Sequence, residues 1–226
     1  MFIDYTPRQV AIHEAGHFVF CCAQNLPMPE VLSIEPQVIG ATMEHQIDRL
    51  PDDQTALGFC ARKPGVIEQL LNAEIEGRTL EEVTKNIYGP TMVSLMTPVT
   101  VADFLKRYRT VRDETAVKLT LMHVAGTAAD AELCGGKGVI PFNDLKPAHD
   151  LAKLLAGEEG AGKLVSEKYS EACGLCRGTY RQPIHAVADK LQAAKTLRES
   201  DLSAVWLDIQ ASFLRQHRRG SSFRSR

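Results

Sequence analysis

The spacing of apolar and polar residues predicts a long first helix near the start of the chain. Residues 7–24 repeat apolar positions with the period of a helix. Its apolar side is formed by Val10, Ala11, Phe18 and Cys21 or Cys22. Thr6 can cap this helix, Pro7 suits its first position, and Gln9 stands three residues after the cap, as a capping box requires.

Beyond this helix the pattern changes to two short β-branched runs, which predict strands over 30–36 and 37–45 around Pro36. Gly40 is a possible bulge in the second strand. The helical period then returns and predicts helices over 66–75, 100–111, 113–133, 180–194 and 201–216, with a further helix that begins near 141. Asn143 is the expected cap of that helix.

These elements predict a mainly α fold with a small β-sheet, of the α+β class. We expect one domain over 1–215 and a disordered basic tail over 216–226, which ends in "HRRGSSFRSR". We find neither an internal repeat nor a long low-complexity linker.

Composition narrows the functional class. The 226 residues are 44% hydrophobic and 24% charged, as in ordinary globular proteins, and their net charge of −2 argues against a nucleic-acid binder. No secretory signal or apolar run long enough to span a membrane is apparent, so we expect a cytoplasmic protein with no membrane span. In that compartment its six cysteines are expected to be mostly reduced.

The first predicted helix carries "HEAGH", which is typical of zinc hydrolases. His13 and His17 are four residues apart and share a helical face, so both rings can bind one ion. Glu14 lies a step around the helix, where it can accept a proton from a zinc-bound water without binding the metal. Gly16 lets another backbone pass close to the helix.

Two other interpretations of this motif stay open. A five-residue pattern of this kind also arises by chance, and the chain would then be a helical scaffold without metal. The zinc could instead be purely structural, in a non-catalytic regulatory or binding module. Burying two imidazoles and a carboxylate on an apolar helix is unfavourable without partners, which favours a metal.

The chain resembles the protease domain of FtsH-type ATP-dependent zinc metalloproteases, a HEAGH zincin family. The resemblance is carried by "HEAGH", by "FNDLKPAHDLAKLL" and by three longer stretches: "VLSIEPQVIGATMEH", "MHVAGTAADAELCGG" and "IHAVADKLQAAKTLRESDLSAV". It implies an FtsH-protease-like helical domain. It also implies a third zinc ligand at Asp144, although Asp150, His149 and His45 remain alternatives.

The departures from the family pattern are informative. The family's membrane anchor and a G-x-x-x-x-G-K-[ST] phosphate loop do not occur in this sequence, so we expect an ATP-independent peptidase. Its substrates would be flexible peptides or unfolded proteins, delivered by a separate ATPase or adaptor. Residues 61–110 look like an insertion, which could be a lid, a substrate-selecting surface or a passive elaboration. The number of subunits stays open.

Two weaker signals remain. The edge of the strand at Gly40, Ala41 and Thr42 is a hypothetical substrate-binding site, where an extended peptide could pair with the backbone. Cys173 and Cys176 form a C-x-x-C pair, which could hold a structural metal with Cys134 or His185, act as a redox pair, or be two ordinary thiols. The leading prediction is a zinc metalloendopeptidase with His13, His17 and Asp144 on the metal and Glu14 as the base.

Overall fold

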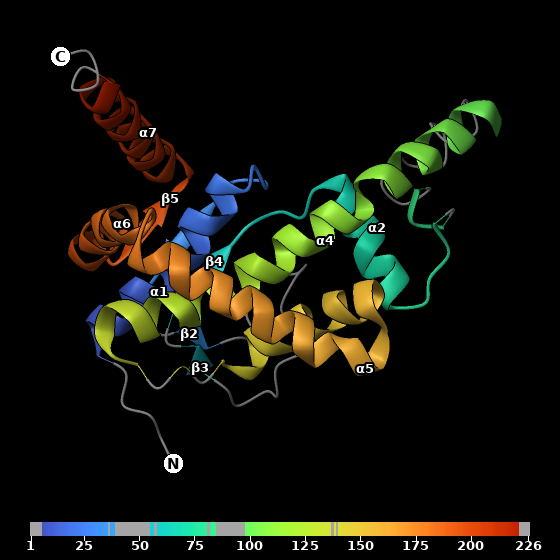
Figure 1. The fold of residues 1–226 in the computed structure, drawn as a ribbon, viewed down its shortest axis with the longest axis horizontal. Coiled ribbons are helices and arrows are strands. Elements are labelled where there is room, and N and C mark those ends of the chain that lie inside the picture. Colours follow the sequence, from blue (N-terminus) through green and yellow to red (C-terminus); the bar gives the residue numbers. More distant parts are fainter. Residues whose placement is uncertain are drawn as a thin grey trace.

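The protein is mainly helical, with a small three-stranded antiparallel sheet and a separate pair of strands among the helices (Figure 1). The computed structural model describes residues 6–35, 37–38, 55–56, 58–80, 82–84, 98–136, 138 and 140–221. The α+β class expected from the sequence is therefore confirmed. None of the helices in these ranges has the length and apolarity needed to cross a membrane.

Helix α1 (Pro7–Ala23) is the central helix of the fold. The expected capping box is present, with the Thr6 side chain accepting a hydrogen bond from the Gln9 backbone N–H at 3.2 Å. Almost every residue from Val10 to Cys22 is buried, because α4 and α6 pack against the helix on different sides. A helix that is buried on all sides is usually apolar all round. The buried polar residues Glu14 and His17 are therefore exceptions on this helix.

Helix α4 (Pro98–Cys134) corrects one prediction. The sequence suggested separate helices over 100–111 and 113–133, but the chain continues through this junction as one helix of 37 residues. Pro98 stands at its start, where a proline is tolerated, and no glycine or proline interrupts the chain before Gly126. The first turns of α4 project from the body of the molecule (Figure 1).

Helix α5 (Phe142–Arg177) corrects another prediction. Asn143 was expected to cap it, but the N-cap is Pro141 and Asn143 lies exposed in the first turn. Gly157 has φ of +71° and kinks the helix, a conformation that glycine adopts without strain. Asp144 therefore stands in the first turn of α5, where a carboxylate is favoured by the helix dipole.

The remaining helices are close to their predicted positions. They are α2 (Val66–Ile75), α6 (Arg181–Ala194) and α7 (Glu199–Ser221). Helix α7 runs past the expected end at 216, so the first part of the expected tail over 216–226 is helical, and 222–226 lie outside the described residues. Whether 61–110 is an insertion stays a prediction. Leu70 and Leu71 of α2 are fully buried, so α2 belongs to the packed body.

Each predicted strand segment, 30–36 and 37–45, contains a short strand, although 39–45 lie outside the described residues, and the structure adds three more strands. The strands are β1 (Val31–Ser33), β2 (Gln37–Val38), β3 (Thr55–Ala56), β4 (Phe59–Ala61) and β5 (Thr196–Arg198). β1 lies between β4 and β5 in an antiparallel sheet, and β2 pairs with β3. The pairing of β1 with β5 joins distant parts of the chain beside α1, which no local pattern could have predicted.

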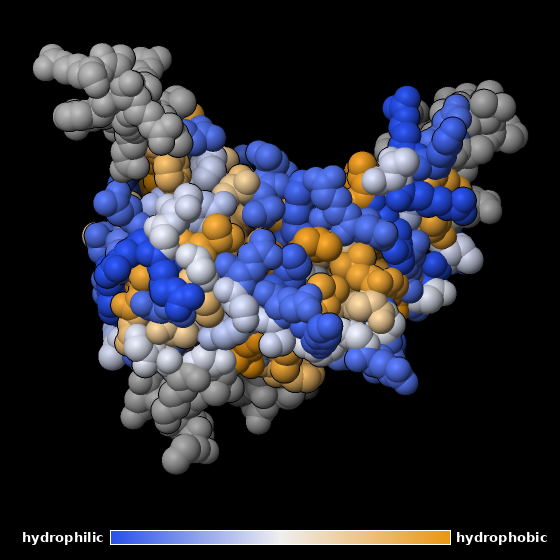
Figure 2. All heavy atoms as spheres, in the orientation of Figure 1, coloured by the Kyte–Doolittle hydropathy of each residue, from blue (hydrophilic) through white to orange (hydrophobic). Residues whose placement is uncertain are grey.

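A close crossing between α1 and α4 fixes the position of the candidate site. A Cβ atom added to Gly16 would lie 2.8 Å from the Ala125 carbonyl oxygen and 2.9 Å from the Ala129 Cβ. The prediction that Gly16 admits a second backbone is therefore confirmed. The surface seen in Figure 2 is largely hydrophilic, with small groups of apolar residues between the charged ones.

Candidate metal centre

The structure brings the three predicted ligand residues together. The Nε2 atoms of His13 and His17 on α1 are 3.1 Å apart. The Asp144 Oδ2 atom, from the first turn of α5, lies 3.2 Å from Nε2 of His13 and 3.5 Å from Nε2 of His17. These are the one group of three or more His, Cys, Asp or Glu residues in the described ranges with the spacing of a metal site.

These distances fit a tetrahedral zinc site. Two ligand atoms bound at about 2.0–2.1 Å with a tetrahedral angle between them are separated by about 3.3 Å. The three observed separations, 3.1, 3.2 and 3.5 Å, lie on both sides of that value. Two imidazoles and one carboxylate also form a donor set that zinc uses at catalytic sites, with a fourth position left for water.

The orientation of the His17 ring is fixed from behind by α4. Its Nδ1 atom lies 2.9 Å from the backbone carbonyl oxygen of Met122. A carbonyl can only accept, so Nδ1 is the donor, and in the neutral ring Nε2 carries the lone pair that faces the cluster. A backbone carbonyl that holds the outer nitrogen of a ligating histidine is a common feature of metal sites.

A glycine on α4 leaves room for an ion. A Cβ atom at Gly126 would lie 2.4 Å from Nε2 of His17 and 2.7 Å from Nε2 of His13. Any side chain at this position would therefore occupy the space in front of both ligand nitrogens. The predictions from sequence did not include Gly126, although it lies within the "MHVAGTAADAELCGG" stretch that carries part of the resemblance.

Charge interactions and hydrogen bonds couple the three side chains strongly. Burial alone lowers the pKa of His17, but the charge and hydrogen bond of Asp144 raise this pKa to about 9. Burial raises the pKa of Asp144, yet the two histidines hold it well below its usual range. His17 and Asp144 therefore favour each other's charged forms.

Glu14 lies beside the cluster but outside it. Its side chain is buried and is covered by the backbone before β4, because a Cβ atom at Gly58 would lie 3.0 Å from the Glu14 Cγ atom. Burial raises the pKa of Glu14, while His13 and His17 lower it. A carboxylate in these surroundings has a higher affinity for a proton than an exposed one, which suits a general base.

Of the three alternative ligands, Asp150 and His149 lie in the described ranges, and neither joins the cluster. Asp150 forms an ion pair with Lys146 at 2.5 Å, and His149 stands beside it on α5 outside the group of three. His45 and the hypothetical substrate residues Gly40, Ala41 and Thr42 lie outside the described residues, so the proposed pairing of a peptide there stays a prediction.

Among the described residues, the cysteine pair shows neither a metal cluster nor a reactive thiol. Cys173 and Cys176 are buried, unpaired thiols on α5, and neither Cys134 nor His185 forms a metal cluster with them among the described residues. Burial raises the pKa of Cys176 to about 12, so its thiol is protonated and unreactive at neutral pH. Ordinary buried thiols are the interpretation that the structure favours.

Two further side chains of α4 stand beside the centre and were missed from the sequence. His123 follows Met122 and is half-buried, and burial lowers its pKa to about 3. Asp130 is buried, its Oδ1 atom has no hydrogen-bond partner among the described residues, and its charge interacts with His13. His123 is three residues before Gly126 and Asp130 is four residues after it. Residues at these spacings share a helix face, so the sequence could have placed both on the face of α4 that carries Gly126.

Comparison with known proteins leaves the resemblance without independent support. No protein-family model matches the chain, and no curated protein matches it.

Proposed function

We propose that this chain is a zinc-dependent metallopeptidase of the FtsH protease type, which hydrolyses peptide bonds in flexible or unfolded polypeptides. The observation that carries this proposal is the convergence of His13, His17 and Asp144 at separations of 3.1–3.5 Å, beside a buried Glu14. A structural site would need four protein ligands, whereas the described residues supply three, which leaves one position for water.

The residues divide the chemistry between them. His13, His17 and Asp144 hold the ion, whose residual positive charge would acidify a water molecule and polarise the peptide carbonyl when it is bound. Glu14 accepts the proton of the attacking water and then donates it to the leaving amine. The Met122 carbonyl keeps the His17 ring in the tautomer that this role requires.

Glu14→Gln is the direct test. The purified zinc-loaded protein and the variant would be compared on unfolded casein and on a quenched fluorescent peptide. We expect kcat to fall by about 10²- to 10⁴-fold, the usual contribution of a general acid–base group. Zinc content should stay at one ion per chain, because Glu14 is not in the ligand cluster.

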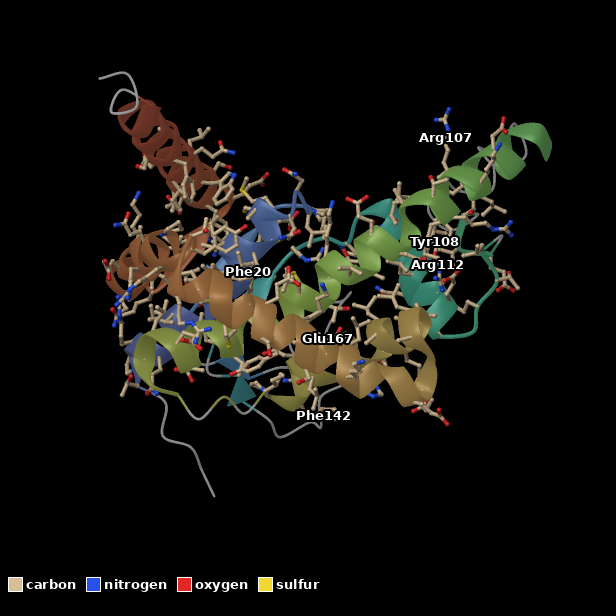
Figure 3. The ribbon with its side chains drawn as sticks, in the orientation of Figure 1. Phe20, Arg107, Tyr108, Arg112, Phe142 and Glu167 are labelled. Carbon is tan, nitrogen blue, oxygen red and sulfur yellow. The ribbon has the colours of Figure 1, made fainter. Side chains whose placement is uncertain are left out.

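Glu167→Gln is the matched control, since Glu167 is exposed on α5 (Figure 3) and should leave kcat unchanged. If neither the wild type nor the Glu14 variant cleaves peptides while both retain zinc, the alternative of a catalytically inactive module with a structural zinc is favoured. Equal cleavage by both proteins would rule out Glu14 as the base. A protein that binds no zinc would leave only a helical scaffold.

A further inference from the structure

The contacts between α1 and α4 place His123 at the wall of the metal centre. α4 approaches the cluster at two points, the Met122 carbonyl 2.9 Å from His17 and Gly126 directly in front of both Nε2 atoms. His123 stands between these points in sequence, three residues before Gly126. Residues three apart on a helix have Cβ atoms about 5–6 Å apart on one side, so His123 borders the space that Gly126 leaves.

Charged groups from three other segments of the chain interact with His123. Its ring interacts electrostatically with Asp144 on α5, His17 on α1 and Arg62 after β4. The guanidinium of Arg62 is itself bound by Glu68 at 2.5 Å through both of its terminal nitrogens. His123 is therefore a half-buried side chain of α4 that interacts with charges on α1, on α5 and on the segment after β4.

The His123 ring has hydrogen-bonding capacity that the described residues do not use. Within the described part of the chain its nitrogens make no hydrogen bond, in contrast to His17 and His185, which bind the Met122 carbonyl and Arg8. An imidazole always carries at least one N–H donor. A donor held on rigid structure beside a reacting carbonyl stabilises the negative charge that develops on its oxygen.

We infer that His123 is a further catalytic residue, whose ring N–H donates a hydrogen bond to the carbonyl oxygen of the scissile peptide bond as that oxygen becomes negative. The inference rests on the proposed peptidase function and adds a residue to it. Glu14 moves the proton, and His123 stabilises the oxygen without itself gaining or losing one. A neutral ring is well suited to this role, because it adds no positive charge beside a cation.

His123→Ala and His123→Gln test this role with three measurements. For the zinc-loaded Ala variant we expect kcat to fall on the order of 10²-fold with KM near that of the wild type, as for a lost oxyanion donor. The Gln variant should recover part of kcat, because its amide can donate. A phosphinic peptide mimics the tetrahedral species, and its inhibition constant should increase by the same factor by which kcat/KM falls. The zinc dissociation constant should not change.

His149→Ala is the matched control, a half-buried histidine on α5 outside the metal cluster, and should match the wild type in all measurements. An active wild type with an equally active His123→Ala variant would overturn this inference alone. Loss of zinc affinity together with activity would also overturn it, since His123 would then support the metal. An inactive wild type would instead refute the proposed function, and this inference with it.

Discussion

At the scale of single residues, the candidate centre depends as much on an absent side chain as on the ligands themselves. His13, His17 and Asp144 supply the donor atoms, but Gly126 supplies the space between them, since a Cβ there would lie 2.4 Å from the His17 Nε2 atom. Where a backbone passes this close to a ligand site, glycine is the residue that fits, because it has no Cβ atom.

Gly126→Ala should therefore abolish zinc binding while the helix persists. The added methyl group occupies the ion's space, whereas alanine favours a helix over glycine by about 1 kcal/mol. We expect the zinc dissociation constant, measured by competition with a chelator, to rise by at least about 10²-fold, comparable to the loss of a direct supporting group.

The control for this change is Gly174→Ala on α5, where an added Cβ would meet nothing within 4 Å. It should bind zinc as the wild type does. Unaltered zinc affinity in Gly126→Ala would show that the ion does not lie between the two imidazoles.

At the scale of elements, one buried ion pair joins α2 to the sheet. The Arg62 side chain after β4 is 8% exposed and that of Glu68 on α2 is 13% exposed, and the two form a bidentate pair. Near the other end of α2, Glu74 binds Arg112 of α4 at 2.6 Å, next to Tyr108 (Figure 3). Helix α2 is thus held at both ends.

Arg62→Ala should destabilise the protein by about 3 kcal/mol, because it leaves the Glu68 carboxylate buried without its partner. The free energy of unfolding from urea titration measures this change. Lys63→Ala is the neighbouring control, since the Lys63–Glu30 pair is exposed and should contribute nothing measurable. Equal stability of the two variants would mean that α2 is not anchored through Arg62.

At the scale of the whole molecule, the candidate centre joins elements from both halves of the chain. The ligands come from α1 and α5, and α4 packs between them as the supporting wall. A cation bound there would hold three helices together, so binding and global stability are linked. A ligand at 100 times its dissociation constant adds about 2.7 kcal/mol to the free energy of unfolding.

This linkage should depend on pH with a definite sign. The pKa of His17 is raised from 6.5 to about 9 in the metal-free fold, so its ion pair with Asp144 stabilises that fold fully below pH 6.5 and ceases to do so as pH rises through 9. Zinc must displace this proton, so its affinity should rise up to tenfold per pH unit in the same range.

Thermal unfolding with and without zinc at pH 6.5 and pH 8.5 measures both effects. We expect the metal-free Tm to fall and the zinc-induced increase in Tm to grow at the higher pH. In Asp144→Ala, which lacks the ligand and the ion-pair partner, the increase should be small at both values. A zinc effect that is independent of pH in the wild type would contradict the assignment of His17 as a ligand.

Local pattern was sufficient for the features whose causes are local. The capping box at Thr6, the run of α1 and the shared face of His13 and His17 all follow from residues within a few positions of one another. The mainly helical class with a small sheet follows in the same way. The two errors concern helix boundaries: α4 continues through 111–113 as one helix, and α5 begins after Pro141, so Asn143 lies in its first turn and not at its cap.

Only the tertiary structure decided which distant groups meet at the histidines. Asp144, Gly126, the Met122 carbonyl and His123 reach the centre because α4 and α5 cross α1 at particular angles and registers. Such contacts are set by how whole faces of helices pack, and no spacing along the chain encodes them directly. The sequence by itself determined the pair of imidazoles and the acid beside them, and the packing of three helices determined whether that pair has a third partner and room for an ion.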